Sequence, residues 1–253
     1  MIEIQNITKK YGKKTVVNQV SAVITEGRLT AFIGSNGAGK STLLSIISRL
    51  LKPDDGKVII DGTEVLAWNQ EELSKRISIL RQSNHMNLRL TIWELVSFGR
   101  YPYSKGQLTE EDEEKIREAL EYTEILELKD RYLDELSGGQ RQMAYIAMVI
   151  AQDTRYIFLD EPLNNLDMKH SVQIMKILRK LVDDLGKTVV IVIHDINFVS
   201  CYADHILALK DGTLIKTGEK KKEIINSDVL SGIYDMNIQI NTIDGKDICI
   251  YYT

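Results

Sequence analysis

The sequence predicts an α/β fold that combines parallel buried strands, an antiparallel β edge and an inserted block of helices. Residues 156–159 and 188–193 are apolar almost throughout, which is typical of strands buried in a parallel sheet. Residues 2–24 contain β-branched stretches without proline, which predict strands at the edge of the fold. Residues 84–152 carry helix-capping signals and apolar residues at helical spacing, so we expect them to interrupt the strands as a helical insert.

The segment before the insert is expected to alternate strands with short helices. The expected elements are strands at 2–7, 16–24 and 29–33, a helix at 42–47, a strand at 57–60, a short helix at 71–75 and a strand at 77–80. Lys52-Pro53-Asp54-Asp55-Gly56 is a stop-and-turn signal after the first helix. Asp61-Gly62 predicts a hairpin turn, because both residue types tolerate the positive φ that such turns require.

Three helix starts are predicted within the insert. Thr91 and Glu94 have the spacing of a capping box, Thr109 is followed by acidic residues, and Ser137 and Gln140 repeat the capping-box spacing. The expected later elements are a helix at 169–185, one at 198–203, a strand at 205–209, and a hairpin of 238–243 with 247–252 around Asp244-Gly245. We expect one folding unit: a catalytic lobe (about 1–83 and 155–218), a helical subdomain (about 84–154) and a C-terminal extension (about 219–253).

Composition limits the classes of function. The 253 residues have a formal net charge of −4, so no basic excess is available for nonspecific nucleic-acid binding, and we expect no nucleic-acid partner. Cys201 and Cys249 are isolated and are expected to be reduced thiols. The N-terminus has no signal-peptide pattern, and no apolar run is long enough to span a bilayer. We therefore expect a cytosolic protein, or one held at a membrane by a partner.

Residues 34–41 form the central motif, because they match G-x-x-x-x-G-K-[ST], the phosphate loop of nucleoside-triphosphatases. Glycines let successive N–H groups turn toward one anion, and a predicted strand before and helix after the loop supply the required context. We expect Lys40 to bind the β- and γ-phosphates and to face solvent when no ligand is bound, and Ser41 to ligate Mg²⁺. The candidate nucleotide-binding residues here are Gly34, Ser35, Asn36, Gly37, Ala38, Gly39, Lys40, Ser41 and Thr42.

Asp160 and Glu161 directly follow the buried strand at 156–159 and are a second motif that indicates a nucleotide-binding site. The carboxyl ends of parallel strands are where ligands bind in open α/β sheets. Asp160 is a candidate Mg²⁺ ligand, and Glu161 is a candidate base that orients and deprotonates an attacking water.

Leu136-Ser137-Gly138-Gly139-Gln140 predicts a second phosphate cradle at a helix N-terminus, about twenty residues before Asp160. With this motif the chain resembles the ATP-binding-cassette (ABC) ATPases over essentially its whole length. The resemblance implies a RecA-like P-loop NTPase core, ATP and Mg²⁺ as ligands, and a head-to-tail homodimer. In such a dimer, Ser137, Gly138, Gly139 and Gln140 of one subunit close on the ATP of the other.

The resemblance implies a role for four further residues. Tyr11 would stack on adenine, and Gln82 would sense Mg²⁺ and the γ-phosphate. Asp167 would reach across the dimer, and His194 would contact the γ-phosphate. The implied catalytic residues are Glu161, His194 and Gln82, and the implied metal ligands are Ser41, Gln82 and Asp160. Asn164-Asn165 departs from the family, because many members have Ser-Ala there.

The resemblance also narrows the biological role. One cassette without a membrane span implies separate integral-membrane permease subunits, an indirect link to a substrate-binding protein, and a peripheral location at the cytoplasmic face of the membrane. Gly99-Arg100-Tyr101-Pro102-Tyr103 and residues 161–171 are similar to cassettes of ferric-siderophore importers of Gram-positive bacteria, including petrobactin-type systems. We expect the insert near Arg100 and Tyr101 to face the permease.

Three alternatives to this interpretation stay open. The first is an importer cassette for haem or cobalamin, because related cassettes share the G-R-x-P pattern. The second is a soluble ABC ATPase that acts outside transport, although the tandem cassettes or long coiled-coil insertions usual in that class are missing from the sequence. The third is a nucleotide-binding module that does not hydrolyse, which the presence of Glu161 and His194 disfavours.

Overall fold

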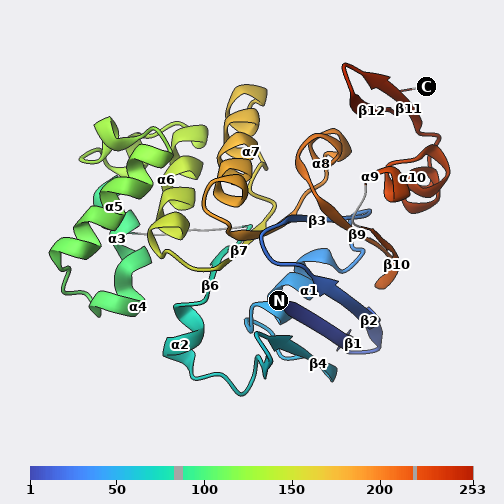
Figure 1. The fold of residues 1–253 in the computed structure, drawn as a ribbon, viewed down its shortest axis with the longest axis horizontal. Coiled ribbons are helices and arrows are strands. Elements are labelled where there is room, and N and C mark those ends of the chain that lie inside the picture. The colour runs from blue at the N-terminus through green and yellow to red at the C-terminus, as the bar shows by residue number, and fades with distance from the viewer. Residues whose placement is uncertain (83–87, 219–220, 253) are drawn as a thin grey trace. The chain divides into compact units, whose positions relative to one another are not determined.

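The structure, a computed structural model, describes residues 1–82, 88–218 and 221–252 (Figure 1). The chain divides into two compact units, which are described separately. The first unit is Met1–Trp68 with Val182–Thr253, and the second is Asn69–Leu181. The boundaries expected near residues 84 and 219 fall on positions outside the described residues.

An antiparallel sheet forms the beginning of the first unit. Its strands, in spatial order, are β2 (Lys14–Ile24), β1 (Ile2–Tyr11), β4 (Asp55–Ile60) and β5 (Thr63–Glu64). Ile2 pairs with Ile24 on one side and with Ile60 on the other, and all three side chains are fully buried. Asp61 and Gly62 both have positive φ, which confirms the predicted hairpin turn between β4 and β5.

A second set of strands in the first unit positions the phosphate loop. In spatial order these strands are β10 (Thr213–Gly218), β9 (His205–Lys210), β3 (Leu29–Ile33) and β8 (Thr188–Val192). Strand β3 is parallel to both β8 and β9, and every residue of β3 and β8 is buried. The chain leaves the end of β3 at residue 34 and enters helix α1 (Lys40–Ile47). The predicted α/β core is confirmed.

The C-terminal segment packs against helix α8 (Ile196–Tyr202) of the same unit. It contains helices α9 (Lys221–Ile224) and α10 (Ser227–Tyr234) and strands β11 (Gln239–Ile243) and β12 (Lys246–Ile250). The Asn197 side chain bonds both backbone groups of Cys249, at 2.7 and 3.2 Å, and Ser200 Oγ donates to the Asp247 carbonyl at 2.6 Å. Positive φ at Asp244 and Gly245 confirms the predicted hairpin turn.

The second unit contains most of the helices and one pair of strands. Its elements are α2 (Gln70–Ser74), β6 (Ile77–Leu80), α3 (Ile92–Ser97), η1 (Phe98–Arg100), α4 (Tyr101–Ser104), α5 (Glu110–Tyr122), η2 (Leu126–Leu128), η3 (Leu133–Glu135), α6 (Gly138–Ala151), β7 (Tyr156–Asp160) and α7 (Met168–Asp183) as far as Leu181. Strands β6 and β7 are parallel, with Ile77 opposite Tyr156. Helices α3, α5 and α6 begin after Thr91, Thr109 and Ser137, as predicted, and each start has a capping box, including the one at Thr109, where only a helix start was predicted.

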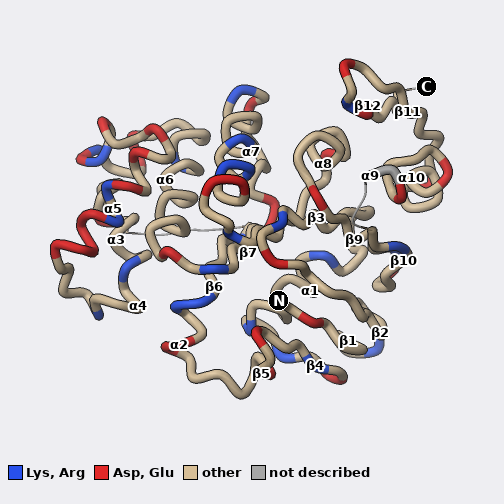
Figure 2. The backbone as a smooth tube through the Cα atoms, viewed as in Figure 1, with Lys and Arg blue, Asp and Glu red and all other residues tan. Residues whose placement is uncertain are grey.

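Helix α5 has a strongly acidic first turn, visible as the red segments along it in Figure 2. Asp112 differs from its acidic neighbours there because it is only 3% exposed. Its Oδ2 accepts from the backbone N–H and the hydroxyl of Thr109, at 3.0 and 2.9 Å. Burial acts to raise the pKa of Asp112, but the bonds from Thr109 and the neighbouring Arg100 outweigh it and hold the pKa below its usual value.

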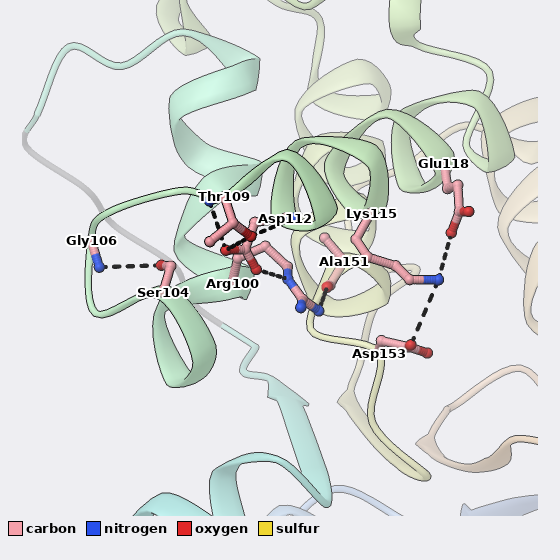
Figure 3. Close-up of polar contacts among 9 residues, drawn as sticks. All are labelled: Arg100, Ser104, Gly106, Thr109, Asp112, Lys115, Glu118, Ala151 and Asp153. Carbon is pink, nitrogen blue, oxygen red and sulfur yellow. Dashed lines mark hydrogen bonds and ion pairs between the residues drawn. The ribbon is translucent and has the colours of Figure 1, made fainter.

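The Arg100 side chain lies inside the second unit, so Arg100 itself is not part of a surface that could face the permease; that the insert around it faces the permease stays a prediction. Its side chain is 4% exposed, and its Nε donates to Asp112 Oδ1 at 2.9 Å (Figure 3). Its Nη1 donates to the Ala151 carbonyl at 3.0 Å, and its guanidinium lies 4.0 Å from the Tyr103 ring centroid. A buried guanidinium needs such partners, because leaving the cation unpaired away from water is costly. Tyr101, in contrast, is 57% exposed.

We predict that Arg100→Glu destabilises the second unit by about 3–5 kcal/mol, the usual cost of breaking a buried ion pair by changing one partner. The substitution places a second carboxylate beside Asp112 and leaves the Ala151 carbonyl without its donor. Urea unfolding followed by circular dichroism measures the effect. Arg117→Glu is the matched control on α5, because Arg117 is 49% exposed and pairs with Glu114 at the surface. Equal unfolding midpoints for the two variants would contradict the prediction.

Candidate functional site

The phosphate loop, residues 34–41, needs glycine at two positions for reasons visible in the first unit. Gly34 and Gly39 have φ of +141° and +95°, which L side chains rarely adopt. A Cβ at Gly34 would lie 2.0 Å from the Leu209 carbonyl oxygen, and one at Gly39 would lie 2.5 Å from the Val16 carbonyl oxygen. The loop is therefore pressed against β9 and β2, and its conformation is built into the fold.

Lys40 is buried, so the expectation that it faces solvent without a ligand is wrong. It is 4% exposed, and its Nζ donates to the carbonyl oxygens of Gly34 and Ser35 at 2.7 and 2.9 Å. Lys40 is the first residue of α1, and its side chain reaches back to the carbonyls at the start of the loop. The cation is thus held within the loop by the loop's own backbone.

Helix α1 begins at Lys40 and directs the positive end of its dipole toward the loop. Gly39, the N-cap residue, has no side chain to accept from the first-turn N–H groups. Ser41 and Thr42 follow in this turn and are partly exposed. A helix N-terminus preceded by a glycine-rich turn is a favourable anion site, and the close-packed glycines and the buried cation here fit a nucleotide's phosphates.

Tyr11 and His194 are the other predicted site residues of the first unit. Tyr11 ends β1 and is 53% exposed, and Lys9 Nζ lies 6.0 Å from the centroid of its ring. His194 follows β8 and is exposed. The next residue, Asp195, caps α8 by accepting from the N–H groups of Asn197 and Phe198, so α8 starts earlier than predicted.

The structure brings Gln82 and Glu161 together in the second unit. Asp160 is the last residue of β7 and is 9% exposed, and Glu161 follows it with a φ of +52°. Gln82 Nε2 donates to Glu161 Oε2 at 2.6 Å, and the Asn164 amide donates to the same oxygen. These two amide donors orient the carboxylate expected to act on a water molecule.

Asn164 is a site residue that the sequence analysis missed. It was noted only as a departure from the family, yet its amide contacts the candidate base Glu161. The backbone N–H of Asn164 also donates to the Glu161 carbonyl at 3.2 Å, which closes a turn between the two residues. An amide side chain three residues after a strand-ending acid is the signal that could have indicated it.

The motif at residues 136–140 begins helix α6 in the second unit. Ser137 Oγ accepts from the Gln140 N–H at 3.2 Å, and Gln140 Oε1 accepts from the Ser137 N–H at 3.1 Å. Ser137 and Gly138 are exposed, whereas Gly139 is buried. The start of a fourteen-residue helix therefore presents an exposed glycine backbone, as a phosphate cradle requires.

Asp167 lies just before α7, and its side chain is 63% exposed. The His170 backbone N–H, followed by the His170 side chain, lowers the pKa of Asp167 below its ordinary value. The carboxylate predicted to reach across a dimer is thus ionised and accessible.

The candidate metal ligands are oxygen donors, which is the chemistry that Mg²⁺ prefers. They are the Ser41 hydroxyl in the first unit and the Gln82 amide oxygen and Asp160 carboxylate in the second. The described residues contain no group of three or more His, Cys, Asp and Glu side chains placed to hold a metal ion. Within the same residues, we find no helix with the length and apolar character needed to cross a membrane.

The fold and these residues define a nucleotide-binding ATPase with a phosphate loop, a strand-ending acid pair and a second glycine-rich cradle. The family model described as "ABC transporter" matches residues 17–164, which is more than half of the chain. The chain belongs to the ABC transporter family, as predicted, and the predicted P-loop fold and ATPase class are confirmed.

Known relatives match over most or all of the chain. The petrobactin import ATP-binding protein YclP of Bacillus subtilis is 59% identical over 253 residues, which is 100% of both chains. The petrobactin import ATP-binding protein FatE of Bacillus anthracis is 46% identical over 95% of this chain and 96% of its own. The dimeric structure of a bacterial ABC transporter cassette has a TM-score of 0.77 and 34% identity, and it covers 87% of this chain and 98% of that chain.

Proposed function

We propose that this chain is the ATP-hydrolysing, energy-coupling subunit of an importer for ferric siderophores. The observation that supports ferric siderophores as the cargo is the full-length 59% identity to a petrobactin import ATP-binding protein. The bonded Gln82–Glu161 pair and the close-packed phosphate loop support ATP hydrolysis.

The proposed roles follow from the chemistry of each side chain. Lys40 and the backbone N–H groups of the phosphate loop bind the phosphates, and Tyr11 stacks on the adenine. Glu161 accepts a proton from the attacking water, and His194 contacts the γ-phosphate. Ser41, Gln82 and Asp160 would hold Mg²⁺, and the bound ion would supply positive charge to neutralise the phosphates.

A head-to-tail homodimer is part of the proposal. Each chain has a phosphate loop and a second cradle at Ser137, Gly138, Gly139 and Gln140, and a single γ-phosphate does not need two cradles from one subunit. Pairing two copies uses both, and Asp167 then contributes across the dimer. The dimeric relative with a TM-score of 0.77 supports this arrangement.

The partners proposed are separate integral-membrane permease subunits, with the chain bound peripherally at the cytoplasmic face of the membrane. A substrate-binding protein would act indirectly, through the permease. Ferric-siderophore import against a gradient requires free energy, which two ATP sites per dimer would supply.

Uptake by cells tests the cargo. We predict that deleting the gene, or replacing it with Glu161→Gln, abolishes energy-dependent uptake of one radiolabelled ferric siderophore, with ferric petrobactin tested first. Amino-acid uptake is the control and should not change. Normal uptake of every ferric siderophore with loss of haem or cobalamin uptake would move the chain to a sister class of importer. Failure of any permease subunit to co-purify, with all uptake normal, would instead support a role outside transport.

A further inference from the structure

His170 contacts the Asp167 carboxylate with two of its groups. It is the third residue of α7, and its backbone N–H donates to Asp167 Oδ1 at 2.9 Å. Its ring Nδ1 lies 2.9 and 2.8 Å from Oδ1 and Oδ2 of the same carboxylate. Because an ionised carboxylate only accepts hydrogen bonds, Nδ1 carries a proton in this arrangement.

The same ring packs on the backbone of Gly139, in the glycine-rich cradle at the start of α6. A Cβ at Gly139 would lie 2.4 Å from Cγ and Cδ2 of His170 and 2.7 Å from its Nδ1. The neighbouring Gly138 has open space at the equivalent position. The imidazole thus occupies the space that a Cβ at Gly139 would need, and one ring touches both Asp167 and the cradle.

A second contact joins the same two segments of the second unit. Gln142, one turn into α6, donates from Nε2 to the Pro162 carbonyl at 2.8 Å. Residues 162–170 thus contact the start of α6 at both ends of the segment. Pro162 accepts from Gln142 at the first end, and His170 packs on Gly139 at the last. Of the two contacts, only His170 reaches a residue expected to act across the dimer.

We propose that His170 is a positioning residue that couples Asp167 to the cradle at residues 137–140, so that both approach the partner subunit's nucleotide as one rigid element. The inference rests on the proposed head-to-tail function. It adds that closure of the dimer depends on the two contacts of one imidazole. Because His170 already holds Asp167 and the cradle together in the monomer, closure of the dimer costs less conformational entropy, which favours the dimer.

Two conservative variants separate the contacts of the ring. His170→Phe keeps a ring over Gly139 but cannot donate to Asp167. His170→Asn keeps an amide donor for Asp167 but removes the ring. Each is made in the Glu161→Gln protein, and ATP-driven dimerisation with Mg²⁺ is followed by light scattering. We expect each to raise the ATP concentration for half-maximal dimerisation about fivefold, the effect of one net hydrogen bond or packing contact.

Controls distinguish positioning from stability. Lys176→Ala changes an exposed residue of the same helix and should leave dimerisation unchanged. Binding of a fluorescent ATP analogue to the monomer should be the same in all variants, and each variant should still unfold cooperatively on heating. Wild-type dimerisation by either His170 variant would overturn the inference, because one of the two contacts would then be dispensable. If the Glu161→Gln parent itself stays monomeric, that result contradicts the proposed head-to-tail dimer, and the inference about His170 fails with the function on which it rests.

A suppressor pair tests the contact with Gly139 independently of variant stability. Gly139→Ala places a methyl group into the His170 ring and should weaken dimerisation more than tenfold. Adding His170→Asn removes the ring and should recover part of that loss. If the double variant is no better than Gly139→Ala alone, the ring does not set the position of the cradle and the inference is wrong.

Discussion

Replacing Lys40 with alanine is expected to abolish ATP hydrolysis and weaken ATP binding while the protein stays folded. Lys40 supplies the cation within residues 34–41, and this cation opposes the charge of the β- and γ-phosphates. Removing one pre-positioned electrostatic group of this kind typically lowers turnover by about 10²–10³-fold. Phosphate release and binding of a fluorescent ATP analogue measure the two effects separately.

The buried position of Lys40 adds a second consequence. In the structure its ammonium donates to the carbonyls of Gly34 and Ser35, so alanine also removes two hydrogen bonds that hold the loop. Lys40→Met is the matched variant, because its apolar stem fills the space without the charge. We expect Lys40→Met and Lys40→Ala to be equally inactive, since the charge is what the phosphates require. Wild-type hydrolysis by either folded variant would overturn the assignment of the phosphate loop.

Local sequence patterns predicted the elements that surround the site. Strands β3 and β6 have the predicted bounds, Leu29–Ile33 and Ile77–Leu80, because each is a short, mostly apolar run that directly follows an arginine. The starts of α3 and α6 were also predicted, since a capping box is made by residues three positions apart. Interactions between residues this close in sequence can be predicted without knowledge of the fold.

Contacts between distant segments explain what the sequence did not predict. The burial of Arg100 depends on Asp112 and on the Ala151 carbonyl, which is 51 residues away. The conformation at Gly34 depends on the Leu209 carbonyl, and neither pairing leaves a local pattern. An arginine in a polar, aromatic stretch has the composition of a surface loop, and only packing shows that it is a buried ion-pair partner.

The orientation of Glu161 also depends on a contact between distant segments, which the sequence did not predict. Its carboxylate oxygen accepts from Gln82, 79 residues earlier, and from Asn164 in the following turn. These contacts determine which hydrogen bonds a Glu161→Gln variant can keep. In Glu161→Gln the amide oxygen can still accept from Gln82 or Asn164, so the local conformation should remain while the proton-accepting group is lost.

Glu161→Gln is therefore expected to separate ATP binding from hydrolysis. Loss of a general base lowers turnover by about 10²–10⁴-fold, whereas groups that only bind phosphate are untouched. ATP affinity should stay near the wild-type value, and ATP with Mg²⁺ should drive stable dimers detectable by light scattering. Glu161→Ala is the control, because it also leaves Gln82 and Asn164 without their shared acceptor and should perturb the site further. Turnover by Glu161→Gln within threefold of wild type would show that another group activates the water, and Glu161 would lose its proposed role.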